Sequence, residues 1–209
     1  MANPDARFGL RPVRHVNGAP WNGATIRCYI SADYATALFI GDPVDFETTA
    51  ANIPTTSRCP SVIRAAGVKT TYILGVITSF EPDPDNLTLQ YRKANTARYC
   101  NVCIARDVVF QIRDNGAAVL TKTVMGANAD GIHTHAGNTI TGLSGFELDA
   151  GTTTAPAADA TYSFVVLSLA DVEDNEFDGT TTTHMIWEVV VNMDRLKVTT
   201  SAALGVLAA

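Results

Sequence analysis

Short segments in which apolar and polar residues alternate run through most of the chain. The plainest are residues 87–91, 108–112 and 185–193, where every second side chain is apolar. A period of two places one set of side chains on one face of a β-strand. Turn-forming sequences, such as Asp-Asn-Gly at residues 114–116, separate these segments. The pattern therefore predicts a series of half-buried strands.

Other segments are strand-like for different reasons. Residues 70–80 and 162–169 are nearly continuous apolar runs, and Gly75 inside the first predicts a bulge. Residues 117–125 could form a short helix, but no segment of about 12 residues or more shows a helical period. We therefore predict an all-β fold, a jelly-roll-like sandwich or barrel of roughly eight to ten strands. The residues predicted to be buried in its core are Val108, Phe110, Ile112, Tyr162, Phe164, Val189 and Val191.

The first 23 residues differ from the rest. Proline and glycine recur in them, which disfavours a helix or a central strand. Apolar anchors stand between these breakers, at Phe8, Leu10, Val13, Val16 and Trp21. We expect residues 1–23 to form an extended N-terminal docking arm that is mobile in the isolated chain and orders on a partner. A frayed terminus is the alternative.

The remaining residues, 24–209, are expected to form a single β-rich domain with a short C-terminal tail at 198–209, which could act as a second arm. The chain has 209 residues, of which 46% are hydrophobic and 17% are charged, enough for one core. No apolar run of membrane-spanning length and no secretory signal are evident, so we expect synthesis in the cytoplasm and no membrane contact.

Charge narrows the possible partners. The formal net charge is −6 and the sequence pI is about 5.1, which argues against a nucleic-acid partner. Up to Arg14 there are three arginines against Asp5, a net charge of +2, whereas the remaining residues carry 12 basic and 20 acidic side chains, a net charge of −8. The arm is thus the basic part of an acidic chain.

Candidate chemistry is sparse. Cys100 and Cys103 form a C-x-x-C within a strand-like stretch, where positions three apart face opposite sides, so buried structural thiols are favoured over a zinc site. His133 and His135 could share a metal, but no third ligand is evident nearby. The acidic residues between 171 and 176 suit a solvated turn better than a cation site. We therefore expect no catalytic residues, no cofactor and no metal.

Several segments resemble one known family. They are residues 2–13 (ANPDARFGLRPV), 17–23 (NGAPWNG), 37–44 (ALFIGDPV), 110–114 (FQIRD), 141–145 (TGLSG), 174–176 (DNE) and 187–192 (WEVVVN). In these stretches the chain resembles the cement, or head decoration, proteins of tailed bacteriophages.

This resemblance implies a non-enzymatic structural virion protein on the capsid exterior. Such a protein would bind the outer surface of the capsid and stabilise the shell at contacts between capsomers of the major capsid protein. It would act as a homo-oligomer, with a trimer favoured and a dimer possible. The residues we expect to contact the capsid or a sister subunit are Phe8, Leu10, Arg11, Pro12, Val13, Arg14 and Trp21.

Two other readings remain open. One is another virion part, such as a tail or head-fibre subunit or a receptor-binding domain. The other is a metal-dependent enzyme on a β-barrel that would use His133 and His135.

Overall fold

A computed structural model describes residues 3–49, 52–54 and 58–196. Within these residues the chain is nearly all β, with 34% strand and 2% helix, and its sheets are antiparallel. The predicted all-β class is therefore confirmed. The predicted C-terminal tail lies outside the described residues.

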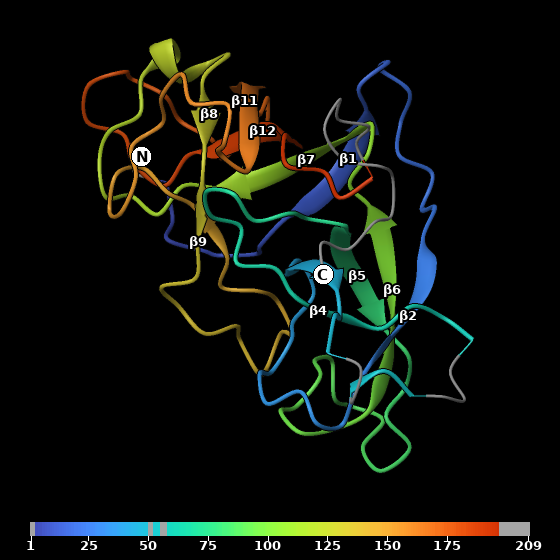
Figure 1. Cartoon of the computed structure of the whole chain (residues 1–209). Helices are drawn as coiled ribbons and strands as arrows, with labels where there is room; N and C mark the ends of the chain where they lie inside the picture. The colour runs from blue at the N-terminus through green and yellow to red at the C-terminus, as the bar shows by residue number, and fades with distance from the viewer. Residues whose placement is uncertain (1–2, 50–51, 55–57, 197–209) are drawn as a thin grey trace.

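The first sheet forms the upper part of the molecule in Figure 1. Among the described residues it has five strands, in the order β1 (Arg11–His15), β7 (Val108–Arg113), β12 (Ile186–Val191), β11 (Phe164–Leu169) and β8 (Asn128–Ala129). Strand β1 is at the edge, and its register with β7 shifts between Pro12 and Arg14. A proline lacks the N–H that a central strand needs, so an edge position with a bulge suits it.

The second sheet lies at the lower right of Figure 1. In the described part of the chain it also has five strands, in the order β2 (Ile26–Ile30), β6 (Arg98–Ile104), β5 (Gly75–Phe80), β3 (Pro43–Phe46) and β4 (Val62–Arg64). Tyr29 of β2 bridges to Ser61 just before β4, and its amide donates to the Pro60 carbonyl at 2.9 Å. The sheet therefore curls towards a closed barrel. A separate ribbon pairs β9 (Gly131–Ile132) with β10 (Glu147–Leu148).

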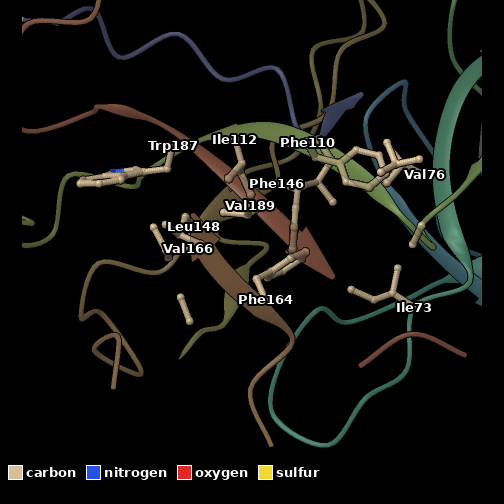
Figure 2. Packing of buried hydrophobic residues seen from close by; sticks show 14 of the residues in the cluster. Ile73, Val76, Phe110, Ile112, Phe146, Leu148, Phe164, Val166, Trp187 and Val189 are labelled. Carbon is tan, nitrogen blue, oxygen red and sulfur yellow. The ribbon is translucent and has the colours of Figure 1, made fainter. Parts of the chain in front are cut away.

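Each sheet has its own apolar cluster. The larger one lies on the first sheet and contains Phe110 of β7, Phe164 of β11 and Trp187 of β12 (Figure 2). The Phe146 ring packs against Phe164, with 6.0 Å between the ring centres. Ile73 and Val76 join this cluster from the β5 side of the second sheet. The smaller cluster is enclosed by the curled second sheet and contains Cys28 and Cys100. Every residue of the predicted core is buried except Val191, which is half-buried.

Strand β7 departs from the expected alternation because all six of its residues are buried. The N-terminal segment covers the face that was expected to be solvated. Arg11 donates to the Gln111 side chain at 2.6 Å, and Arg113 donates to the Pro4 carbonyl at 2.8 Å. The polar side chains of β7 thus bind their own N-terminus instead of water.

Three local predictions were wrong. Residues 87–91 form no strand. The Arg98 guanidinium donates hydrogen bonds to the Leu89 and Tyr91 carbonyls, so these carbonyls cannot pair with a neighbouring strand. The β5 bulge falls between Ile77 and Ser79 rather than at Gly75. A Cβ at Gly75 would lie 2.2 Å from the Cys103 carbonyl, so this glycine permits close strand approach.

The predicted short helix is the third case. Within residues 117–125 there is a single 3₁₀ turn, η2, at Lys122–Val124. This stretch includes Thr121, Thr123 and Val124, whose β-branched side chains disfavour a helix.

Candidate functional site

The N-terminal segment is fixed to its own domain along its described length. Asn3 is buried, and its side chain donates to the carbonyls of Glu176 and Thr183, each at 3.1 Å. Arg7 lies 3.1 Å from a carboxylate oxygen of Glu147, whose side chain is fully buried. Leu10 is 2% exposed and belongs to the large apolar cluster. The expected N-terminal docking arm, mobile until it meets a partner, is therefore not confirmed.

Two glycines allow this close attachment. Gly9 and Gly41 both have positive φ, and a Cβ at Gly41 would lie 2.4 Å from the Phe8 carbonyl. The Leu10 amide donates to the Gly41 carbonyl at 2.9 Å. A larger residue at either glycine would force the two backbones apart.

The turn that receives the segment is held by a buried carboxyl group. Asp42 is 2% exposed, and it accepts hydrogen bonds from the Ser144 hydroxyl and from the Phe39 amide. Burial raises the pKa of Asp42 to about 6, although both hydrogen bonds act in the opposite direction. Asp42 thus joins the 39–42 turn to the loop that carries Ser144.

An apolar groove of about 300 Å³ opens where these segments meet. Its lining comes from the N-terminal segment, from the second sheet and from the loop around Ser144. The lining residues are Phe8, Leu10, Arg11, Pro12, Trp21, Ile40, Ile77, Thr78 and Leu143. We call this surface the seam groove, because it lies at the junction of the two apolar clusters.

A smaller groove of about 210 Å³ adjoins it and shares Trp21. Trp21 is half-buried, packs against the large cluster and lines both grooves. Its amide donates to the Val13 carbonyl at 3.3 Å, which folds residues 16–21 back along the outer edge of β1. Residues 11–21 thus form a hairpin, and its second half covers the outer edge of β1.

The seam groove brings together five of the seven predicted contact residues: Phe8, Leu10, Arg11, Pro12 and Trp21. Val13 and Arg14 are not part of its lining. Arg14 lies 2.6 Å from the Glu188 carboxylate, so its charge is already paired within the chain. Arg11 donates instead to a neutral amide and lies 4.8 Å from the centre of the Phe8 ring.

Sequence reasoning missed the other wall of the groove, formed by Ile40, Ile77, Thr78 and Leu143. Ile40 and Leu143 lie in segments that carry the family resemblance, and this was the signal available. Nothing in the sequence assigned Ile77 and Thr78 to the same surface as Phe8.

The C-x-x-C cysteines are separated as expected. Cys100 lies in the small cluster and Cys103 in the large one, and both are free thiols. Burial raises the pKa of Cys28 to about 12 and that of Cys103 to about 11, which disfavours the reactive thiolate.

His133 and His135 do not share a site. The His133 ring packs against Phe146 and its Nε2 faces the Ala65 carbonyl at 3.3 Å. Burial lowers the pKa of His133 to about 4. His135 Nδ1 lies 2.9 Å from Glu147 Oε2. No potential metal-ligand group found among the described residues contains both histidines.

No helix in the described ranges is long and apolar enough to cross a membrane. No protein-family description, curated protein or solved structure matches the chain.

Proposed function

We propose that this chain is a structural virion protein that binds the outer surface of a phage capsid. Its role would be to stabilise the shell at contacts between capsomers of the major capsid protein, without catalysing a reaction. The seam groove would be its docking surface.

One observation carries this proposal. Three segments that resemble the decoration proteins, residues 2–13, 37–44 and 141–145, converge on the seam groove. They are far apart in the chain, yet Gly9, Gly41 and Ser144 lie in direct contact. The segments that carry the resemblance therefore lie together at one concave surface, which supports a binding role for it.

The surface has the chemistry of a protein contact. Aromatic and aliphatic side chains line it, and Arg11 lies at its exposed edge. Buried aromatic residues and arginine are the side chains that most often dominate binding energy. Because the N-terminal segment is already ordered on its domain, binding would not have to pay for ordering it.

A symmetric oligomer would multiply this contact. Identical subunits that cover a closed shell present several equivalent grooves to it, and linked weak contacts give avidity. The trimer remains our favoured state and the dimer the alternative.

The test is a binding titration on undecorated shells of the phage that encodes the chain. Trp21→Ala should weaken binding by at least about 30-fold, the loss expected for a residue worth about 2 kcal/mol at an interface. Tyr72→Ala is the matched control, because Tyr72 is 36% exposed but is not part of the groove lining.

Circular dichroism and thermal unfolding must show that both variants are folded. Equal affinity of wild type, Trp21→Ala and Tyr72→Ala would refute the groove as the docking surface. Failure of the wild-type protein to bind the shells would refute the function itself.

A further inference from the structure

Three potential metal ligands converge beneath the N-terminal segment. Asp5 comes from that segment, Glu147 from β10, and His184 from the residues just before β12. One ligand atom of each lies within 4.8 Å of the other two. We propose that Asp5, Glu147 and His184 bind one divalent transition-metal ion of the zinc class.

The two carboxylates are oriented for this role. Arg7 Nη2 lies 2.8 Å from Asp5 Oδ2, and Arg7 Nε lies 3.1 Å from Glu147 Oε2. His135 Nδ1 also contacts Glu147 Oε2. Asp5 Oδ1 is 3.7 Å from His184 Nδ1, and Glu147 Oε1 is likewise left for a cation. Groups that hold the distal oxygen of a ligating carboxylate are a regular feature of metal sites.

Two buried atoms of this cluster have no hydrogen-bond partner among the described residues. The Glu147 side chain is fully buried, and its Oε1 has no hydrogen-bond partner among the described residues. His184 Nδ1 is also buried without a hydrogen-bond partner there. A buried carboxylate oxygen without a partner is costly, and an ion is one of the recognised explanations. A cation that took Glu147 Oε1 and His184 Nδ1 as its ligands would satisfy both atoms.

The imidazole is held in place by its surroundings. The His184 amide donates to Asp114 at 2.9 Å, and the His184 carbonyl accepts from Arg113 at 2.5 Å. A Cβ at Gly116 would lie 2.4 Å from the His184 ring, so only glycine leaves room for it. The ring is therefore fixed close to Asp5.

The donor set selects the metal. One imidazole nitrogen and two carboxylate oxygens suit Zn²⁺ better than Ca²⁺ or Mg²⁺, which prefer oxygen ligands throughout. Arg7 and Arg113 lie near the carboxylates and oppose a cation, so we expect weaker binding than at a closed structural zinc site.

The bound ion would tie Asp5 to the main domain and so fix the start of the segment that carries Phe8 into the seam groove. This inference departs from the sequence-based expectation of no metal. It does not depend on the proposed function, because it concerns the attachment of the segment within one chain.

Isothermal titration of the EDTA-stripped protein with ZnCl₂ tests the site. We expect saturable binding of one Zn²⁺ per chain and a higher unfolding temperature with zinc present. Asp5→Asn should lower the affinity at least tenfold and remove the thermal shift. Asp5 is exposed, so this variant should fold even if Glu147→Gln does not. Asp171→Asn, at another exposed carboxylate, is the matched control.

His184→Ala, compared with His15→Ala, tests the nitrogen ligand in the same way. No saturable zinc binding would overturn the proposal. Unchanged affinity in folded Asp5→Asn would also overturn it, and so would binding of CaCl₂ but not of ZnCl₂.

Discussion

The two sheets differ in how their edge strands are covered. The second sheet curls on itself, so that β2 meets the residues before β4, and it encloses a small cluster of its own. The first sheet instead takes its edge strand β1 from the N-terminal segment and buries Leu10 in its cluster. The second sheet is therefore self-contained, whereas the first is incomplete without the N-terminus. The seam groove lies between this edge strand, at Arg11 and Pro12, and strand β5, at Ile77 and Thr78.

The largest expected effect lies in the cluster of the first sheet. Phe110 is fully buried in the large apolar cluster (Figure 2), so Phe110→Ala should lower the free energy of unfolding by roughly 3–5 kcal/mol. Urea denaturation measures this loss. A value below about 1 kcal/mol would mean that the large apolar cluster is not tightly packed around Phe110.

The contribution of the N-terminal segment to the large apolar cluster is tested by Leu10→Ala. Because Leu10 is 2% exposed, its truncation should cost roughly 2–5 kcal/mol in the same assay. Val16→Ala is the control: Val16 is 56% exposed on the same hairpin, and its truncation should change stability by about 0.5 kcal/mol or less. Equal, small losses in both variants would show that the N-terminal segment is not part of the core.

Two buried titratable groups should make the stability of the folded protein depend on pH in opposite directions. Asp42 has a pKa of about 6 in the folded protein against 3.8 ordinarily, so its contribution to stability falls as pH rises from about 4 to 6. His133 has a pKa of about 4 against 6.5, so its contribution rises with pH over about 4 to 6.5. Each amounts to roughly 3 kcal/mol at most, and in the wild type they largely cancel.

Variants that remove one of the two groups should reveal the contribution of the other to stability. Asp42→Asn should leave a protein whose stability rises with pH across this window, because the contribution of His133 remains. His133→Gln should show the reverse slope. Urea unfolding at about pH 4.5, 5.5 and 6.5 measures both slopes. Identical pH profiles of the two variants would contradict the assigned protonation states.

The smallest effect concerns charge at the groove. Arg11→Gln should slow association with undecorated shells at low ionic strength and have little effect at high salt, because exposed charges act mainly on the encounter rate. Lys93→Gln, at another exposed cation, is the control for net charge. A rate that does not depend on Arg11 at any salt concentration would remove the electrostatic part of the docking proposal.

Much of the fold could be predicted because strand periodicity is local. Residues 108–112 and 185–193 alternate within a few positions, and both lie in or around the observed strands β7 and β12. Residues 87–91 show the same alternation but form no strand, since Arg98 captures their carbonyls. Such competition depends on a side chain that the local pattern does not contain.

Part of the candidate site could likewise be predicted from local sequence, and part could not. Phe8, Leu10, Pro12 and Trp21 could be predicted as contact residues, because apolar anchors between proline and glycine need a surface to cover them. That this surface belongs to the same chain could not be predicted, since it depends on the approach of Gly9 to Gly41. The ligands Asp5 and His184 come from opposite ends of the sequence, so no spacing rule could pair them.

The N-terminal segment forms one wall of the seam groove before any partner binds. Hydrogen–deuterium exchange of the free protein tests it most directly at the Leu10 and Trp21 amides, which donate to Gly41 and Val13. We predict slow exchange at both amides, with protection approaching that of the β7 amides. Exchange at the rate of an unstructured chain, with β7 still protected, would show that the segment is not held on its domain.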